Sequence, residues 1–150
     1  MRTVVQRVTS ASVCVDGEEK GRVGKGLLVF VGIKTDDTED EVLWMANKIR
    51  KLRVFEDESG KMNLSTEDIK GGFLIISQFT LYGDCQRGTR PSFSDAAAPG
   101  HAVPLYERFI ELIKESGLPV GTGVFGADMK IRADNDGPVT IILERDHAEV

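Results

Sequence analysis

Leu27-Leu28-Val29-Phe30-Val31-Gly32-Ile33 is an unbroken apolar run that lies between Gly26 and a polar loop. Its length and its β-branched residues favour a buried strand. On its N-terminal side, Thr3 to Val8 and Ser12 to Val15 also have the composition of strands. Asp16-Gly17 follows them and is a turn signal that predicts a β-hairpin.

The segment after this run has the pattern of an amphipathic helix. Thr38 and Glu41 have the spacing of a capping box, which marks a helix start. Five apolar residues then recur at helical spacing and form one face: Val42, Met45, Ala46, Ile49 and Leu52. A second helix is predicted with Pro104 in its first turn, where proline is tolerated, and with its end near Gly117. Its apolar face consists of Leu105, Phe109, Leu112 and Ile113.

Further strands are predicted for four segments: Phe73 to Leu81, Val120 to Phe125, Met129 to Ile131 and Val139 to Leu143. Many strands with only two good helices predict an α+β fold. The sheet is expected to be mostly antiparallel, as an open sheet or a barrel, with the two helices packed on one side. The length of 150 residues fits a single domain over residues 1–150.

The composition excludes several classes of protein. No stretch approaches ~20 apolar residues, which excludes a membrane span, and residues 1–8 lack the apolar core of a signal peptide. The two cysteines form no scaffold pattern, so a reducing cytoplasm is the expected location. Two histidines and no CxxC motif argue against a Cys/His zinc site, and we expect no metal and no cofactor. The net charge of −5 argues against a protein that coats nucleic acid non-specifically, but it permits a local basic patch.

Three segments carry polar groups that could support chemistry. Ser77-Gln78-Phe79-Thr80 places polar side chains in an otherwise apolar strand, which predicts that some of them reach a cleft. On spacing alone, hydroxyls that bond neighbouring backbone are the simpler explanation. Asn135-Asp136-Gly137-Pro138-Val139-Thr140 is by default a turn before a strand, although a cis Gly-Pro bond would present backbone carbonyls in a rigid fork. Gln86 to Phe93 contains two arginines that could contact phosphates or pin the loop to acidic neighbours.

Together these motifs resemble the D-aminoacyl-tRNA deacylase family, also called the D-tyrosyl-tRNA deacylases, along essentially the whole chain. The two signature segments of that family are Ser77-Gln78-Phe79-Thr80 and Gly137-Pro138-Val139-Thr140, and neither departs from the family pattern. Four further matches occur in the family's order: Gln6-Arg7-Val8, Lys61-Met62-Asn63-Leu64, Arg87-Gly88 with Arg90-Pro91-Ser92-Phe93, and Phe125 with Ala127-Asp128-Met129.

The resemblance implies β-barrel-like subunits that form a homodimer with active sites at the interface. It implies hydrolysis of the ester of D-aminoacyl-tRNA at a catalytic segment formed by Ser77, Gln78, Phe79 and Thr80. It also implies that Gly137 and Pro138, joined by a cis bond and braced by Arg7, enter the partner's site and reject L-amino acids sterically. Phe125 and Met129 are expected to contact the substrate. Glycine has no side chain to reject, so hydrolysis of glycyl-tRNA is expected too.

Two mechanisms are compatible with the residues. Thr80 could attack as a nucleophile, although no base partner is visible in the sequence. Alternatively, the 2′-hydroxyl of the terminal ribose assists, while backbone N–H groups around Phe79 and Thr80 stabilise the oxyanion. The poor inventory of acid–base side chains favours the second mechanism. Phe125 or Phe79 could stack on the adenine, or both could be core residues. Two other classes stay open, namely a non-catalytic RNA-binding module and a different hydrolase on the same scaffold.

Overall fold

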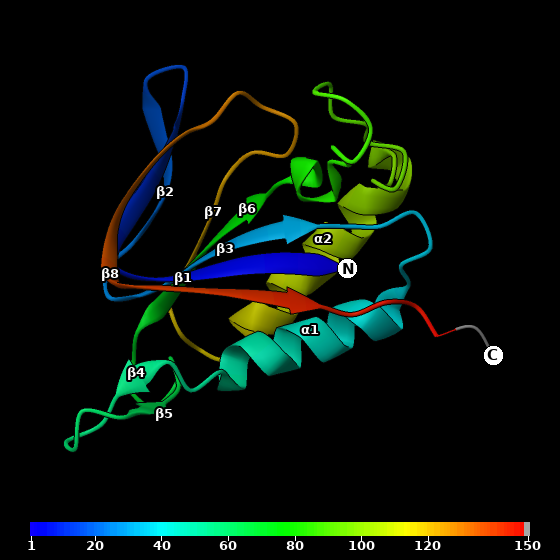
Figure 1. Ribbon diagram of the computed structural model, residues 1–150. Helices are drawn as coiled ribbons and strands as arrows, with labels where there is room; N and C mark the ends of the chain where they lie inside the picture. The colour runs from blue at the N-terminus through cyan, green and yellow to red at the C-terminus, as the bar shows by residue number, and fades with distance from the viewer. Residues whose placement is uncertain (149–150) are drawn as a thin grey trace.

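The computed structural model describes residues 1–148 and has an α+β fold, as predicted (Figure 1). Its elements, in chain order, are β1 (Arg2–Val15), β2 (Glu18–Val23), β3 (Gly26–Gly32), α1 (Glu39–Lys51), β4 (Phe55–Glu56), β5 (Met62–Leu64), β6 (Gly72–Ser77), the 3₁₀ helix η1 (Phe79–Tyr82), α2 (Pro99–Lys114), β7 (Val120–Thr122) and β8 (Lys130–Glu144). Among the described residues, no helix is long and apolar enough to cross a membrane.

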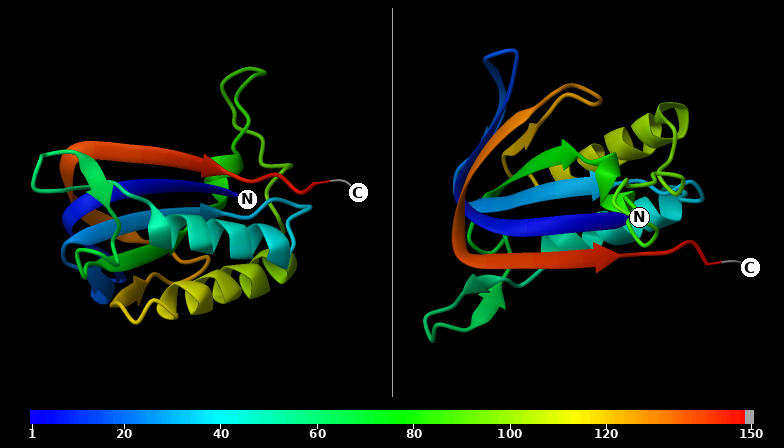
Figure 2. Two further views of the ribbon diagram at one scale, coloured as in Figure 1. Left: turned by 90° about the horizontal axis from the view of Figure 1, so that it is seen from below. Right: turned by 45° about the horizontal axis from the view of Figure 1, so that its top comes forward.

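The main sheet has six strands and is covered on one face by both helices. Its strand order is β2-β1-β3-β6-β7, and β8 pairs with β1. Both helices lie on the same face of the sheet and contact each other, as two views show (Figures 1 and 2). The larger core lies between the helices and the sheet, and a smaller core fills the curled part of the sheet. The prediction of two helices packed on one side is confirmed.

The strand directions correct one part of the prediction, because the sheet is mixed and not mostly antiparallel. β1 pairs antiparallel with β2, β3 and β8. β3 pairs with β6 in parallel, and β6 pairs with β7 in parallel. The cause lies in the connections, since α1 lies in the crossover between β3 and β6, and α2 lies in the crossover between β6 and β7. Such long helical crossovers join parallel strands, whereas a two-residue turn joins antiparallel ones.

The sheet curls until β2 almost meets β7, so that the barrel is nearly closed. Glycines on both strands make this approach possible. A Cβ atom on Gly21 would lie 2.6 Å from the carbonyl oxygen of Thr122, and a Cβ on Gly121 would lie 2.8 Å from that of Arg22. Any side chain at either position would force the two strands apart.

Two signals of local sequence are confirmed. Asp16 and Gly17 both have positive φ angles, 51° and 77°, and they connect β1 to β2 as a two-residue hairpin loop. Thr38 and Glu41 form the capping box at the start of α1, where the Glu41 carboxylate accepts the Thr38 backbone N–H at 2.6 Å. Burial raises the pKa of the Glu41 carboxyl. Hydrogen bonds from the Thr38 hydroxyl and backbone, and from His147, outweigh that effect and lower the pKa to about 2.

Several element boundaries differ from the prediction. The predicted strand Phe73 to Leu81 ends at Ser77, because residues 79–82 turn into η1, and the predicted strand Val120 to Phe125 ends at Thr122. α2 begins at Pro99 rather than with Pro104 in its first turn, and Pro104 lies inside the helix. Pro99 sits at the helix start, where its missing N–H costs nothing. The predicted strands Met129 to Ile131 and Val139 to Leu143 fall in one long strand, β8, which begins one residue later than predicted, at Lys130, and follows β1 along most of its length.

Candidate functional site

A cavity of about 270 Å³ lies where three parallel strands end. β3, β6 and β7 run in the same direction, so their carboxyl ends meet at one edge of the sheet, the position where sheets of this kind bind ligands. The start of α2 and the loop between β7 and β8 complete the walls. The lining residues are Val31, Ile33, Ile76, Ser77, Gln78, Phe79, Ala97, Ala102, Tyr106, Phe125, Gly126, Ala127, Asp128, Met129 and Ile131.

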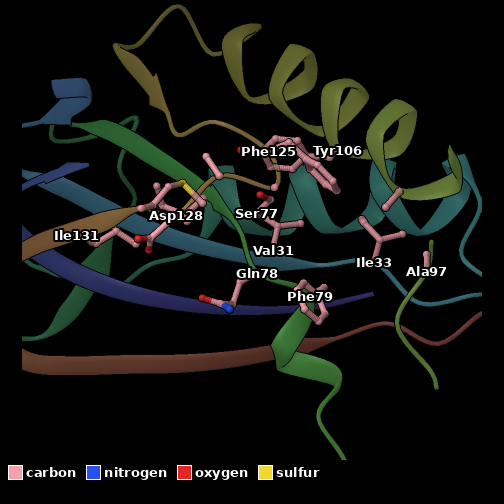
Figure 3. A pocket seen from close by; sticks show the side chains of 15 residues that line it. Val31, Ile33, Ser77, Gln78, Phe79, Ala97, Tyr106, Phe125, Asp128 and Ile131 are labelled. Atoms are coloured by element: carbon pink, nitrogen blue, oxygen red, sulfur yellow. The ribbon is translucent and has the colours of Figure 1, made fainter. Parts of the chain in front are cut away.

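The walls of the pocket differ in character. Gln78 and Phe79 lie on one side, where β6 passes into η1 (Figure 3). Phe125 and Tyr106 lie on the side next to α2, and their rings are 5.8 Å apart in a tilted arrangement. The rest of the lining is almost wholly apolar. A pocket of this kind holds a flat or apolar group and orients it with few polar contacts.

Ser77 and Gln78 supply polar groups to the pocket. Ser77 is half-buried, and among residues 1–148 its hydroxyl has no hydrogen-bond partner. The backbone N–H of Gln78 donates to the carbonyl of Val31 at 2.8 Å, which fixes the end of β6 against β3. The side-chain amide of Gln78 donates to the Thr80 hydroxyl.

Thr80 lies outside the lining of the pocket and is exposed. The first backbone bond of η1 runs from the N–H of Leu81 to the carbonyl of Gln78. The N–H groups of Phe79 and Thr80 therefore have no acceptor within the described part of the chain. Two free donors beside the pocket mouth can receive negative charge that develops on a bound group.

The pocket contains little that could transfer a proton at neutral pH. Burial raises the pKa of the Tyr106 phenol to about 12, although a hydrogen bond with the backbone of Ser77 opposes the effect. Its O–H donates to the carbonyl of Ile75 at 3.1 Å. Asp128 is exposed at the rim and pairs with Lys130 at 3.2 Å. The histidines lie elsewhere, since His101 bonds to the carbonyl of Asp37 and His147 to Glu41.

The second signature segment forms a bulge away from this pocket. β1 advances by two residues from Gln6 to Val8, whereas their partners on β8, Thr140 and Asn135, are five residues apart. The Gly137-Pro138 bond lies within this bulge and is cis, and both residues are exposed. Neither of them lines the pocket of their own chain.

Arg7 anchors the bulge to the body of the chain and is almost fully buried. Its Nε donates to the carbonyl of Asp136 at 3.1 Å, and its Nη1 donates to the carbonyl of Val54 at 2.7 Å. A carboxylate oxygen of Asp136 lies 3.3 Å from Nε as well. One guanidinium thus connects the bulge of β8 to the segment that leads into β4.

The structure brings together five of the predicted site residues: Ser77, Gln78, Phe79, Phe125 and Met129. Thr80 is adjacent to them, whereas Arg7, Gly137 and Pro138 form a separate group on β1 and β8. The sequence analysis missed Tyr106, Ala97 and Val31. These residues have the composition of ordinary core positions, and only the packing of α2 against the ends of β3 and β6 makes them walls of a pocket.

Comparisons with known proteins give consistent matches. The model of the family described as D-Tyr-tRNA(Tyr) deacylase matches residues 4–144. A D-aminoacyl-tRNA deacylase of Thermotoga petrophila is 58% identical over 144 residues, which cover 96% of this chain and 97% of the relative. The D-aminoacyl-tRNA deacylase of Chlorobaculum tepidum is 59% identical over 145 residues, with the same coverage.

Solved structures with the same fold were found as well. A c-Myc DNA Unwinding Element Binding Protein matches with a TM-score of 0.91 and 43% identity, over 98% of this chain and all of that one. A probable eukaryotic D-amino acid tRNA deacylase matches with a TM-score of 0.81 over 95% of this chain and 97% of that one. Its identity is 18%, so this second likeness concerns the fold alone.

Proposed function

This chain belongs to the D-Tyr-tRNA(Tyr) deacylase family, and from that membership and its pocket we propose how it hydrolyses the ester of D-aminoacyl-tRNA. The enzyme class, a D-aminoacyl-tRNA deacylase, follows from the family. The proposal concerns the catalytic group, the selection between D- and L-amino acids, and the assembly. One observation carries it, namely that the segments Ser77–Phe79 and Phe125–Met129 enclose one pocket with almost no acid–base side chain.

Catalysis relies on position and electrostatics rather than on a protein nucleophile. The pocket binds the terminal adenosine, with Phe125 or Phe79 stacked on its base. The free N–H groups of Phe79 and Thr80 stabilise the oxyanion that forms when the ester carbonyl is attacked by water. The 2′-hydroxyl of the terminal ribose assists that attack. Supporting this choice, the Thr80 hydroxyl is exposed, lies outside the pocket lining and is bonded to Gln78.

Selection between the two hands of amino acid uses the bulge at Gly137 and Pro138. In the proposed assembly the bulge of one chain enters the pocket of a second copy. A D-side chain then points to solvent, while an L-side chain would collide with the Gly137-Pro138 backbone wall. Glycine has no side chain that could collide with this wall, so glycyl-tRNA is hydrolysed as well. The exposed position of both residues supports this role, because a residue that must enter another chain cannot be buried in its own.

The second copy is supported by the unpaired edge of β8. Within the described residues, β8 pairs with β1 alone, so its other edge is free along the whole strand. Ile142, four residues beyond Pro138, is 64% exposed on that strand. A long edge strand with an exposed apolar side chain is an aggregation hazard unless another chain covers it. We therefore assign this surface to a homodimer interface. Because the proposed substrate is a tRNA, we also propose that the enzyme acts in the cytoplasm.

A turnover assay with matched substrates tests the proposal. Enzyme at a concentration well below that of D-tyrosyl-tRNA is expected to release the amino acid completely, and to leave L-tyrosyl-tRNA intact. Binding without turnover would instead show a non-catalytic RNA-binding module. Equal hydrolysis of both hands would show a different hydrolase on the same scaffold.

A variant of the bulge tests the selection step directly. Pro138→Ala is expected to hydrolyse L-tyrosyl-tRNA measurably while D-tyrosyl-tRNA is still consumed. Pro99→Ala, the same substitution at an exposed proline outside the pocket lining, is the control and is expected to preserve the selectivity. If Pro138→Ala spares L-tyrosyl-tRNA completely, the bulge does not select.

A further inference from the structure

The loop between η1 and α2 stands out from the body of the protein. It projects from the rest of the chain in the views of Figures 1 and 2, near the start of α2. Its neck is held by two backbone hydrogen bonds between Asp84 and Ser92, with lengths of 2.7 and 2.9 Å. Gly88 takes a positive φ of 75° at the turn. The loop therefore has a defined structure that is closed at its base by hydrogen bonds, and residues 84–92 are called the arm.

The tip of this arm, residues 86–91, carries two positive charges and no negative one. Arg87 and Arg90 are both exposed, and among residues 1–148 neither forms a salt bridge or a side-chain hydrogen bond. The idea that they pin the loop to acidic neighbours is thus not supported within the described chain. Two unpaired guanidinium groups are notable in a protein with a net charge of −5.

A second group of cations lies at the end of α1 and behaves differently; its members are Lys48, Arg50, Lys51 and Arg53. Arg50 pairs with Glu67 at 2.8 Å, and Arg53 donates to the carbonyl of Asn63 at 2.9 Å. Lys48 lies over the ring of Trp44, with its Nζ 5.2 Å from the ring centroid. Lys48, Arg50 and Arg53 thus have partners inside the protein, and only Lys51 of this group has none among the described residues. The arm, in which both arginines are unpaired, is the better candidate for a partner outside the protein.

The arm is also coupled to the pocket. The Phe93 ring packs edge-on against the Phe79 ring, with centroids 5.2 Å apart, and Phe79 lines the pocket. Four residues closer to α2, Ala97 lines the pocket and donates its N–H to the carbonyl of Ile33 at 2.9 Å. Gly88 is five residues from Phe93, so the turn lies no more than roughly 17 Å along the chain from the residue that packs against the pocket wall.

We propose that Arg87 and Arg90 bind phosphate groups of the RNA strand that leads into the pocket, in the nucleotides just before the terminal adenosine. This inference rests on the proposed function, because it assumes that the pocket holds the end of a tRNA. A guanidinium matches the geometry of a phosphate with two parallel hydrogen bonds. Such contacts position a nucleic-acid strand without reading its sequence, so one arm serves tRNAs of many sequences.

The test compares a substrate that carries the RNA strand with one that lacks it. D-tyrosyl-tRNA has the strand, whereas D-tyrosyl-adenosine has the same ester and base but no phosphate. The double variant Arg87→Gln/Arg90→Gln is expected to lower kcat/KM for D-tyrosyl-tRNA about tenfold at low salt. For D-tyrosyl-adenosine, kcat/KM is expected to stay unchanged. For D-tyrosyl-tRNA, the slope of log kcat/KM against log salt concentration is expected to be less negative by about 1.4 in the double variant, which is the value for two contacts to a single strand.

A matched control removes the same charge elsewhere. Arg22→Gln/Arg108→Gln also deletes two arginines, the exposed Arg22 and the half-buried Arg108, which pair with glutamates on β2 and on both helices. This control is expected to leave kcat/KM for D-tyrosyl-tRNA and its salt dependence unchanged. An equal loss in the control would show a general charge effect and would overturn the proposal.

Other outcomes separate this inference from the proposed function. If the wild-type enzyme hydrolyses neither substrate, the proposed function fails first. If the wild-type enzyme hydrolyses both and the arm variant loses activity on both equally, the arm shapes the pocket through Phe93 and does not bind phosphate. If the arm variant changes the particle mass in light scattering, the arginines serve the subunit interface. Either of the last two results refutes the phosphate contacts.

Discussion

Replacing Arg7 with methionine should impair the selection that we assign to the bulge, while the pocket keeps its ability to hydrolyse the ester. Arg7→Met keeps a long, unbranched side chain in the buried space but removes every donor. Two carbonyl groups then lose their partner, that of Asp136 in the bulge and that of Val54 before β4. The pocket residues make no hydrogen bond to Arg7 and should keep their positions.

The expected loss of stability can be estimated from these contacts. A hydrogen bond to a charged group contributes about 1.5–3 kcal/mol, and a buried acceptor without a partner is costly. The Asp136 carboxylate, about 40% exposed, adds little because solvent screens it. The two carbonyl contacts together give about 3 kcal/mol or somewhat more, which corresponds to a fall in Tm of about 6–12 °C. A domain of ordinary stability remains folded after that loss.

Two assays measure the consequences. Urea unfolding should show the midpoint shift, with an unchanged dependence on urea concentration. Below the new Tm, the ratio of kcat/KM for D-tyrosyl-tRNA to that for L-tyrosyl-tRNA should fall at least tenfold, since the bulge has lost its anchor. Arg7→Lys keeps the charge but lacks the planar fork, and it should lie between the wild type and Arg7→Met in both assays.

A specific combination of results would refute this reasoning. If Arg7→Met loses the expected stability and still rejects L-tyrosyl-tRNA as well as the wild type does, Arg7 has a structural role only. If neither stability nor selectivity changes, the two hydrogen bonds to Asp136 and Val54 contribute nothing measurable.

Three further predictions concern the helix cap at Glu41, the role of Thr80 and the pocket residue Met129. The pKa of Glu41 is about 2 in the folded chain against 4.5 ordinarily, so its contribution is complete above about pH 4.5 and is lost as the pH falls towards 2. Glu41→Gln should remove about 3 kcal/mol at neutral pH and flatten this acid limb in urea titrations from pH 2 to 7, and an unchanged acid limb would contradict the assignment. Thr80→Ala should retain most turnover of D-tyrosyl-tRNA whereas a 2′-deoxy substrate should be nearly inert. The opposite result, loss only with Thr80→Ala, would favour the nucleophile. A Cβ at Gly123 would lie 2.5 Å from the sulfur of Met129, so Gly123→Ala should displace this pocket side chain and raise KM severalfold with a smaller effect on kcat. Unaltered kinetics would show that Met129 does not contact substrate.

The parts of the fold that local sequence controls were predictable. The hairpin at Asp16-Gly17 and the capping box at Thr38 depend on residues within four positions of each other. Strand direction is different, because it depends on which distant segments pair. The parallel pairing of β3 with β6 arises from a crossover that contains α1, and the continuous apolar run in Gly72–Ser77 indicates a buried strand without fixing its partner or its direction.

The site shows the same division. Ser77 and Gln78 were identifiable as polar residues in an apolar strand, and the resemblance to the family assigned them to the site. Tyr106 was not identifiable, because it occurs on α2 at the spacing of core residues and reaches the pocket only through packing. The separation of Gly137 from Ser77 within one chain was implied by the family resemblance but by no local pattern, since it follows from the long pairing of β8 with β1.

The separation of pocket and bulge also has a genetic consequence. In the proposed dimer each reaction centre takes its pocket from one chain and its bulge from the other. A mixed dimer of a chain with a damaged pocket and a chain with a damaged bulge then contains one centre made entirely of intact parts. Two alleles that are each non-functional alone would complement each other when co-expressed, whereas two alleles with lesions in the same part would not.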